Sequence, residues 1–209
     1  MRIAVIGSGV VGRTLATAFR RAGHDVVVGT RDPEVTADRE EWADVDLPLS
    51  PLADAGAGAD VVVNATPGAG SLEALAKVDL DGKVLIDVSN PLDFSNGFPP
   101  TLTVKDTDCL AEQIQRAHPE ARVVKALNMV NAAIMVRPDS LPETSTTFLA
   151  GDDPLARETV RELLRELGWV DIIEFPTLDG ARGMEMWLPL WVRLMGALGT
   201  AEFNLRLVR

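Results

Sequence analysis

Residues 3–12 read Ile-Ala-Val-Ile-Gly-Ser-Gly-Val-Val-Gly, an unbroken apolar run followed by three glycines in the spacing Gly-x-Gly-x-x-Gly. The run Ile3–Ile6 is typical of a strand buried on both faces of a parallel sheet. The next stretch, Val11–Arg21, carries apolar residues at helical spacing, and the apolar run Val26–Gly29 follows it. The glycines therefore lie in the first turn of a predicted strand–helix–strand unit.

In this context the glycine motif predicts a turn that binds a dinucleotide. Gly7 permits a tight turn, Gly9 lets the backbone approach a pyrophosphate, and Gly12 lets the helix pack closely against the strand. The start of the helix then offers free N–H groups and a positive dipole end to the phosphates. The alternative is a glycine-rich turn without a ligand. The residues predicted to bind the cofactor here are Gly7, Ser8, Gly9, Val10, Val11 and Gly12.

The end of the second strand predicts which cofactor is bound. NAD-binding chains of this kind place an acidic residue there to bind the ribose hydroxyls, but this chain has Thr30 and Arg31, and Asp32 comes only afterwards. A threonine hydroxyl and an arginine fork suit a dianionic 2′-phosphate. The sequence therefore predicts NADP(H) rather than NAD. The alternative is a solvated Arg31 paired with Asp32 or Glu34.

The rest of the chain alternates short apolar runs with amphipathic stretches, a pattern that indicates right-handed βαβ units. Further candidate strands are Val61–Ala65, Val84–Val88, Val123–Ala126, Thr146–Leu149 and Val170–Ile173, and further candidate helices are Leu110–Ala117, Pro154–Leu167 and Met184–Leu198. The predicted fold class is α/β, a Rossmann-type, doubly wound, mostly parallel sheet with helices on both faces and a small C-terminal α/β extension. We expect an NADP-binding domain over residues 1–130 and a smaller part over residues 131–209 that closes the acceptor cleft.

Two stretches fit this pattern poorly. Thr36–Gly58 is acidic and weakly patterned, and we expect in it a short strand near Leu47–Leu49 and a helix near Pro51–Ala55. Asn90–Lys105 is rich in Pro, Gly and Asn and is predicted to be a long loop, either a lid or an interaction surface.

Composition excludes several classes of partner. The 31 acidic residues outnumber the 20 Lys and Arg, for a net charge of −11, which argues against nucleic acid and anionic membranes. One cysteine, Cys109, permits no internal disulfide and no cysteine-based metal cage, and with two histidines, His24 and His118, no zinc site or other metal is expected. The first apolar run ends after four residues, and Met184–Leu198 contains Glu, Pro and Arg, so neither predicts a signal peptide or a membrane span. We expect a cytoplasmic protein.

The carboxyl ends of the strands should form the site, since ligands of such sheets bind there. Ala65, Thr66 and Pro67 follow one strand, Ser89 and Asn90 follow the next, and Asn128 follows a third. His24 and His118 precede strands and therefore belong at the opposite edge.

Lys125 lies in an apolar strand run and either serves as an acid or supports a neighbouring loop carbonyl; Asp87 is the nearest carboxylate candidate. A site without an evident proton donor suits direct hydride transfer between two bound rings.

The chain resembles the NADPH:coenzyme F420 oxidoreductases, which are deazaflavin-dependent NADP reductases, and is similar to the cytosolic reductase domain of the metalloreductases. The resemblance rests on Ile6–Gly12, Ala22–Arg31, Val123–Asn128, Gly151–Asp153 and Leu188–Leu190. It implies a Rossmann domain that binds NADP, with the phosphate-binding pair on Thr30 and Arg31. It places the nicotinamide loop on Ala65, Thr66 and Pro67, and the segment facing the deazaflavin ring on Asn128, Val130 and Asn131. The asparagine at position 128 is similar to the residue that the metalloreductase domains carry there, and those domains pass hydride to a flavin.

We therefore expect an NADP-dependent oxidoreductase that moves hydride between NADPH and coenzyme F420 or a flavin. One alternative is an enzyme like the β-hydroxyacid dehydrogenases or imine reductases, with Lys125 and Asn128 acting on a carbonyl. Such enzymes need a large helical second domain, for which residues 129–209 are too few. Another alternative is a non-enzymatic NADP-sensing module. The apolar helix Met184–Leu198 is either ordinary core or a pocket wall combined with a homodimer surface.

Overall fold

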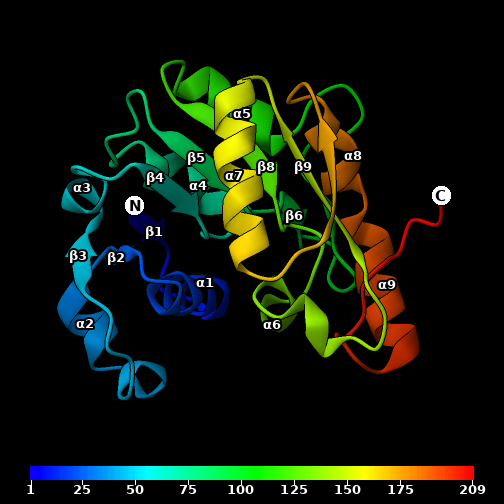
Figure 1. Cartoon of the computed structure of the whole chain (residues 1–209), viewed down its shortest axis with the longest axis horizontal. Coiled ribbons are helices and arrows are strands. Elements are labelled where there is room, and N and C mark those ends of the chain that lie inside the picture. The colour runs from blue at the N-terminus through cyan, green and yellow to red at the C-terminus, as the bar shows by residue number, and fades with distance from the viewer.

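The computed structural model describes all of residues 1–209, which form an eight-stranded sheet in the order β10-β9-β8-β5-β4-β1-β2-β3 (Figure 1). Every pairing from β3 to β8 is parallel, whereas β9 runs antiparallel to β8, and β10 is parallel to β9. The predicted α/β class with a mostly parallel sheet is therefore confirmed. The strands of this sheet are β1 (Arg2–Ile6), β2 (Asp25–Thr30), β3 (Leu49–Pro51), β4 (Val61–Asn64), β5 (Val84–Asp87), β8 (Arg122–Ala126), β9 (Thr146–Gly151) and β10 (Asp171–Phe175).

Helices cover both faces of the sheet, as the alternation of side chains along β1 illustrates. Ile3 and Val5 join one hydrophobic cluster, whereas Ala4 and Ile6 join the other. The first cluster packs against α1, α6 and α7, and Figure 1 shows α7 lying across that face. The second packs against α3, α4, α5, α8 and α9. The helices are α1 (Val10–Arg21), α2 (Pro33–Ala37), α3 (Leu52–Ala55), α4 (Gly68–Leu75), α5 (Leu110–Ala117), α6 (Ala132–Met135), α7 (Pro154–Glu166), α8 (Gly180–Met186) and α9 (Leu188–Leu198), with 3-10 turns η1 (Glu40–Trp42) and η2 (Pro138–Ser140).

Three local expectations were wrong. The stretch Asn90–Lys105 is not a plain loop, because β6 (Leu92–Asp93) and β7 (Thr101–Leu102) pair antiparallel within it. Helix α4 was missed. The single helix expected over Met184–Leu198 is two helices that meet at Trp187, and the proline at 189 lacks the N–H that would continue α8.

Residues 131–209 extend the sheet through β9 and β10 and add α6 to α9. The C-terminal tail is tied to the start of β9, because Thr146 N donates to Leu205 O at 2.9 Å and Leu207 N donates to Thr146 Oγ1 at 2.9 Å. The domain boundary at residue 130 stays a prediction. None of the helices has both the length and the apolar character needed to cross a bilayer.

Candidate functional site

The glycine loop after β1 has a backbone that other residues could not adopt. Gly7 has φ +119°, and a Cβ there would lie 2.6 Å from Ala65 O. A Cβ at Gly12 would lie 1.9 Å from Gly7 O, so only glycine lets α1 pack this closely. The conformational roles predicted for Gly7 and Gly12 are confirmed. At Gly9 a Cβ would meet nothing within 4 Å, which leaves open space in front of the turn.

The start of α1 faces that open space with free backbone donors. Its N-cap, Gly9, makes no side-chain hydrogen bond, and the first turn contains no acidic residue. The helical bonding begins only with Arg13 N donating to Gly9 O at 2.9 Å. The preceding amides of the first turn and the positive helix end are therefore available to an anion.

A cavity of about 560 Å³ opens beside the glycine loop, at the carboxyl ends of β1, β2 and β4. It brings together six of the residues predicted to bind the cofactor, which come from three separate loops: Gly7, Ser8, Thr30, Arg31, Thr66 and Pro67. The size and the mixed polar lining suit part of a dinucleotide.

Arg31 is exposed at this cavity and forms no ion pair, so the alternative pairing with Asp32 or Glu34 is not observed. Asp32 instead caps α2 by accepting a hydrogen bond from Val35 N at 3.0 Å. The Thr30 hydroxyl is buried and lies 2.8 Å from Thr36 Oγ1. Thr30 therefore ties the end of β2 to α2, and the Arg31 guanidinium is the free charge.

Two residues that contact the glycine loop were not predicted from the sequence. Trp42 Nε1 donates to Ser8 O at 3.1 Å, and Arg39 Nη1 donates to Ser8 Oγ at 3.4 Å. Both come from the stretch with weak patterning, so η1 and the turn before it contact the glycine loop. A lone tryptophan in that otherwise acidic stretch was the one signal of a buried anchor.

A buried polar network fixes the loops after β4 and β5. Asn64 Nδ2 donates to Asp87 Oδ1 at 2.9 Å, and Asn64 Oδ1 accepts from Thr66 Oγ1 at 2.7 Å. Ser89 Oγ also donates to Asp87 Oδ1, at 2.7 Å. Ser89 is thus held by Asp87 directly and Thr66 through Asn64, and both were predicted to contact the cofactor.

Lys125 is fully buried on β8 and satisfies all of its donors. Its Nζ lies 2.8 Å from Asp87 Oδ2, 2.8 Å from Glu185 Oε1 and 2.5 Å from Ser89 O. Of the two predicted roles, support of a loop carbonyl is confirmed. Burial alone lowers the pKa of Lys125, but the carboxylates of Asp87 and Glu185 outweigh it and raise the pKa above its usual range.

Glu185 links the C-terminal helices to this cluster and was not anticipated. Its carboxylate accepts from Leu110 N at 2.9 Å and Ala111 N at 3.1 Å, which are amides of the first turn of α5. It therefore joins α8, α5 and β8 at one point. A single acid in the largely apolar stretch Met184–Leu198 was the signal that could have identified it.

Asn128 connects the loop after β8 to two neighbours. Its Nδ2 donates to Asn90 Oδ1 at 2.9 Å and to Met184 O at 3.0 Å. Because Met184 O can only accept, the orientation of the amide is fixed, and the buried Oδ1 is left without a partner. Val130 is buried, and Asn131 caps α6 by accepting from Ala133 N at 2.7 Å.

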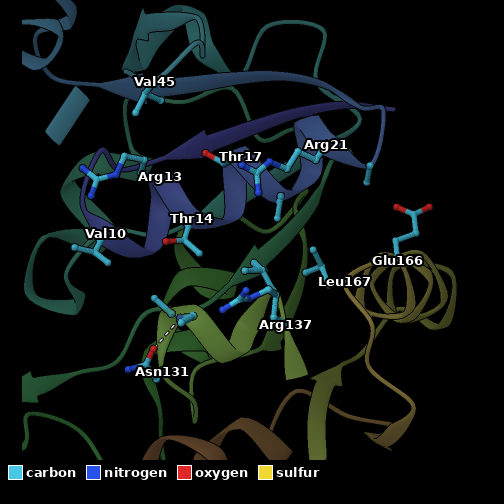
Figure 2. A pocket seen from close by; sticks show the side chains of 15 residues that line it. Val10, Arg13, Thr14, Thr17, Arg21, Val45, Asn131, Arg137, Glu166 and Leu167 are labelled. Atoms are coloured by element: carbon cyan, nitrogen blue, oxygen red, sulfur yellow. Dashed lines mark hydrogen bonds between the residues drawn. The ribbon is translucent and has the colours of Figure 1, made fainter. Parts of the chain in front are cut away.

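A second cavity of about 720 Å³ lies between α1 and the segment of α6 (Figure 2). It begins at Val10 beside the glycine loop and at Asn131, the N-cap of α6, and it ends near Leu167 after α7. Two predicted site residues line this second cavity: Val10, which was predicted to contact the cofactor, and Asn131, which was predicted to contact the acceptor.

Both histidines lie at the amino edge of the sheet, as predicted. His24 directly precedes β2, and its Nε2 is 2.6 Å from Glu166 Oε2. His118 ends α5 before β8. Neither can exchange a proton with a ligand at the opposite edge.

Several known proteins are similar to this chain in sequence and in structure. The family model described as NADP oxidoreductase, coenzyme F420-dependent, matches residues 2–91. The F420-dependent NADP reductase of Methanothermobacter thermautotrophicus is 31% identical over 207 residues, covering 93% of this chain and 89% of that protein. Metalloreductase STEAP3 of Rattus norvegicus is 31% identical, covering 95% of this chain and 39% of that longer protein. A crystal structure from Arthrobacter sp. FB24, described as a candidate F420-dependent NADP reductase, is 48% identical, with full coverage of both chains and a TM-score of 0.97.

Proposed function

Because this chain belongs to the family of F420-dependent NADP reductases, we propose that it transfers a hydride between NADP(H) and a deazaflavin or flavin ring. The chain is an NADP-dependent oxidoreductase with a Rossmann-type sheet. The proposal concerns the acceptor and the residues that hold both ligands. Coenzyme F420 is the leading candidate for the acceptor, and a flavin is the second.

The residues around the first cavity divide the binding of NADP(H) between them. The amides of the α1 N-terminus and the glycine loop bind the diphosphate, and Arg31 binds the 2′-phosphate. The loops carrying Thr66, Ser89 and Asn128 surround the nicotinamide, which supplies or receives the hydride when the cofactor is bound. The unpartnered Oδ1 of Asn128 supports this arrangement, because a buried carbonyl oxygen needs a donor such as a ligand N–H.

One observation carries the choice of acceptor: the ammonium of Lys125 is saturated by three acceptors and buried from any ligand. Reduction of a C=O or C=N bond requires a proton at the heteroatom as well as a hydride, usually from a positioned acid. Neither histidine lies at this edge of the sheet, and the lysine that lines the cavity, Lys77, is paired with Glu73 at 3.2 Å. Hydride transfer between two stacked rings needs only orientation and exclusion of water at the site, and the accompanying proton exchanges with solvent.

The same observation weighs against the β-hydroxyacid dehydrogenase or imine reductase alternative. That chemistry would need Lys125 to point at a substrate, but here it supports Ser89 O and balances two carboxylates.

The decisive experiment offers the protein and NADPH a series of acceptors in separate cuvettes: F420, FMN, FAD and a panel of ketoacids. Bleaching of F420 or reduction of a flavin supports the proposal. Turnover of a ketoacid, with no reduction of F420 or flavin, would reject it. A matched reaction with Lys125→Met then tests the assignment, since hydride transfer between rings should survive in whatever fraction of this variant folds.

Dimerisation through α9 and a cytoplasmic location stay predictions. Leu190 and Leu198 on α9 are exposed, as an interface would require. Light scattering after size exclusion measures the oligomeric state directly, and a monomer at micromolar concentration would contradict the dimer.

A further inference from the structure

We infer that Arg39 is a second guanidinium for the 2′-phosphate of NADP, acting together with Arg31, and that it helps to set the preference for NADP over NAD. The inference rests on the proposed binding of NADP(H) in the cavity beside the glycine loop. It adds to that site a residue that comes from a different segment of the chain.

The position of Arg39 supports this role. Arg39 lines the same 560 Å³ cavity as Arg31, and it reaches that cavity from the turn between α2 and η1. Its Nη1 lies 3.4 Å from Ser8 Oγ, in the middle of the glycine loop. The guanidinium of Arg31 thus approaches the cavity from the end of β2, and that of Arg39 approaches it from the turn after α2.

The charge balance of the cavity leaves both arginines unneutralised. Its other charged residues are Asp32, Glu73 and Lys77. The carboxylate of Asp32 is engaged at the N-terminus of α2, and Glu73 pairs with Lys77 at 3.2 Å. The single side-chain partner of Arg39 is a neutral hydroxyl. Two guanidiniums without carboxylate partners, in a chain with a net charge of −11, are suited to a bound dianion.

The backbone of this turn is held firmly enough to place Arg39. Arg39 N donates to Thr36 O at 3.3 Å, and Trp42 N donates to Arg39 O at 2.9 Å. Buried Trp42 then fastens the turn to Ser8 O, and the hydroxyls of Thr30 and Thr36 fasten α2 to the end of β2. Both guanidiniums therefore belong to one connected unit built on the glycine loop, and binding needs little more than reorientation of their side chains.

The test is calorimetric titration of the purified protein with NADPH and NADH, and with the fragments 2′,5′-ADP and 5′-AMP. In Arg39→Gln we expect the Kd for NADPH and for 2′,5′-ADP to rise about tenfold, the loss of one charge-assisted contact. The Kd for NADH and for 5′-AMP should change less than about twofold, since these ligands lack the phosphate. Arg20→Gln is the control, because Arg20 is an exposed arginine outside the cavity.

Arg39→Lys should lose part of the affinity, because a lysine keeps the charge but not the fork. Arg31→Gln combined with Arg39→Gln should bring the affinities for NADPH and NADH close together. An unchanged Kd for NADPH in Arg39→Gln would overturn the inference. Equal weakening of NADPH and NADH would also overturn it, because it would indicate a diphosphate contact or a disturbed loop. These titrations need no acceptor, so failure to reduce F420 or a flavin would reject the proposed function and leave the role of Arg39 standing.

Discussion

Replacing Lys125 with methionine tests the central cluster of this fold. The substitution keeps most of the volume of the side chain but removes the ammonium that lies 2.8 Å from both Asp87 Oδ2 and Glu185 Oε1. Both carboxylates are buried, so neither can recover its solvation without opening the structure. Ser89 O also loses its donor.

The expected loss of stability is large. Removing one partner from a buried ion pair costs about 3–5 kcal/mol. That is a fifth or more of the roughly 5–15 kcal/mol by which such a protein is stable. For a chain of this length it corresponds to a fall in Tm of about 6–20 °C. The control is Lys77→Met, which breaks an exposed pair with Glu73 at 3.2 Å and should cost less than about 1 kcal/mol.

Urea unfolding of the two variants measures the difference, with the slope of the transition checked for two-state behaviour. Adding Glu185→Gln to Lys125→Met should restore part of the loss, because one of the two stranded carboxylates is then removed. If Lys125→Met were no less stable than Lys77→Met, or if the double variant lost the sum of both effects, the reasoning about this cluster would be wrong.

Three further outcomes are expected. Arg31→Ala should weaken the binding of NADPH by about 1.5–3 kcal/mol and change the binding of NADH little. If calorimetry returned an unchanged ratio of the two dissociation constants, the assignment of Arg31 would be refuted. Gly12→Ala forces a Cβ to 1.9 Å from a backbone oxygen, so it should lower Tm sharply and abolish NADPH binding. The control is Gly196→Ala in α9, where a Cβ would meet no atom within 4 Å and should stabilise the helix by about 0.5–1 kcal/mol. Burial lowers the pKa of His118 despite the opposing charge of Asp81, so protonation opposes folding and stability should fall as pH drops below about 6.5. Urea titrations of His118→Gln should show a smaller acid dependence than wild type, and an identical one would count against that burial effect.

The sequence predicted the nucleotide-binding half of the fold because its signals are local. In β1, α1 and β2 the apolar runs, the helical spacing and the glycine turn lie within about thirty residues and agree with one another. Helix α4 lacked such a signal, since it begins Gly-Ala-Gly and glycine forms helices poorly. The two-residue strands β6 and β7 were too short to show any period.

The candidate site divides in the same way. Gly7, Arg31 and Thr66 were found because each follows a strand that the pattern itself identifies. Arg39 and Glu185 were missed because their roles depend on contacts that the local sequence does not encode. Arg39 reaches Ser8 across 31 residues, and Glu185 reaches Leu110 across 75. Only the folded arrangement brings these side chains to the strand ends.

The hydrogen bond from the Trp42 indole to Ser8 O gives this protein a built-in optical reporter. The chain has four tryptophans, and this one is attached to the turn that we propose binds the cofactor phosphates. Its emission should therefore respond when a nucleotide occupies that turn, including non-reducible analogues that produce no absorbance change. Fluorescence from a variant that keeps Trp42 and replaces the other three with phenylalanine would follow cofactor binding on the stopped-flow timescale, separately from hydride transfer.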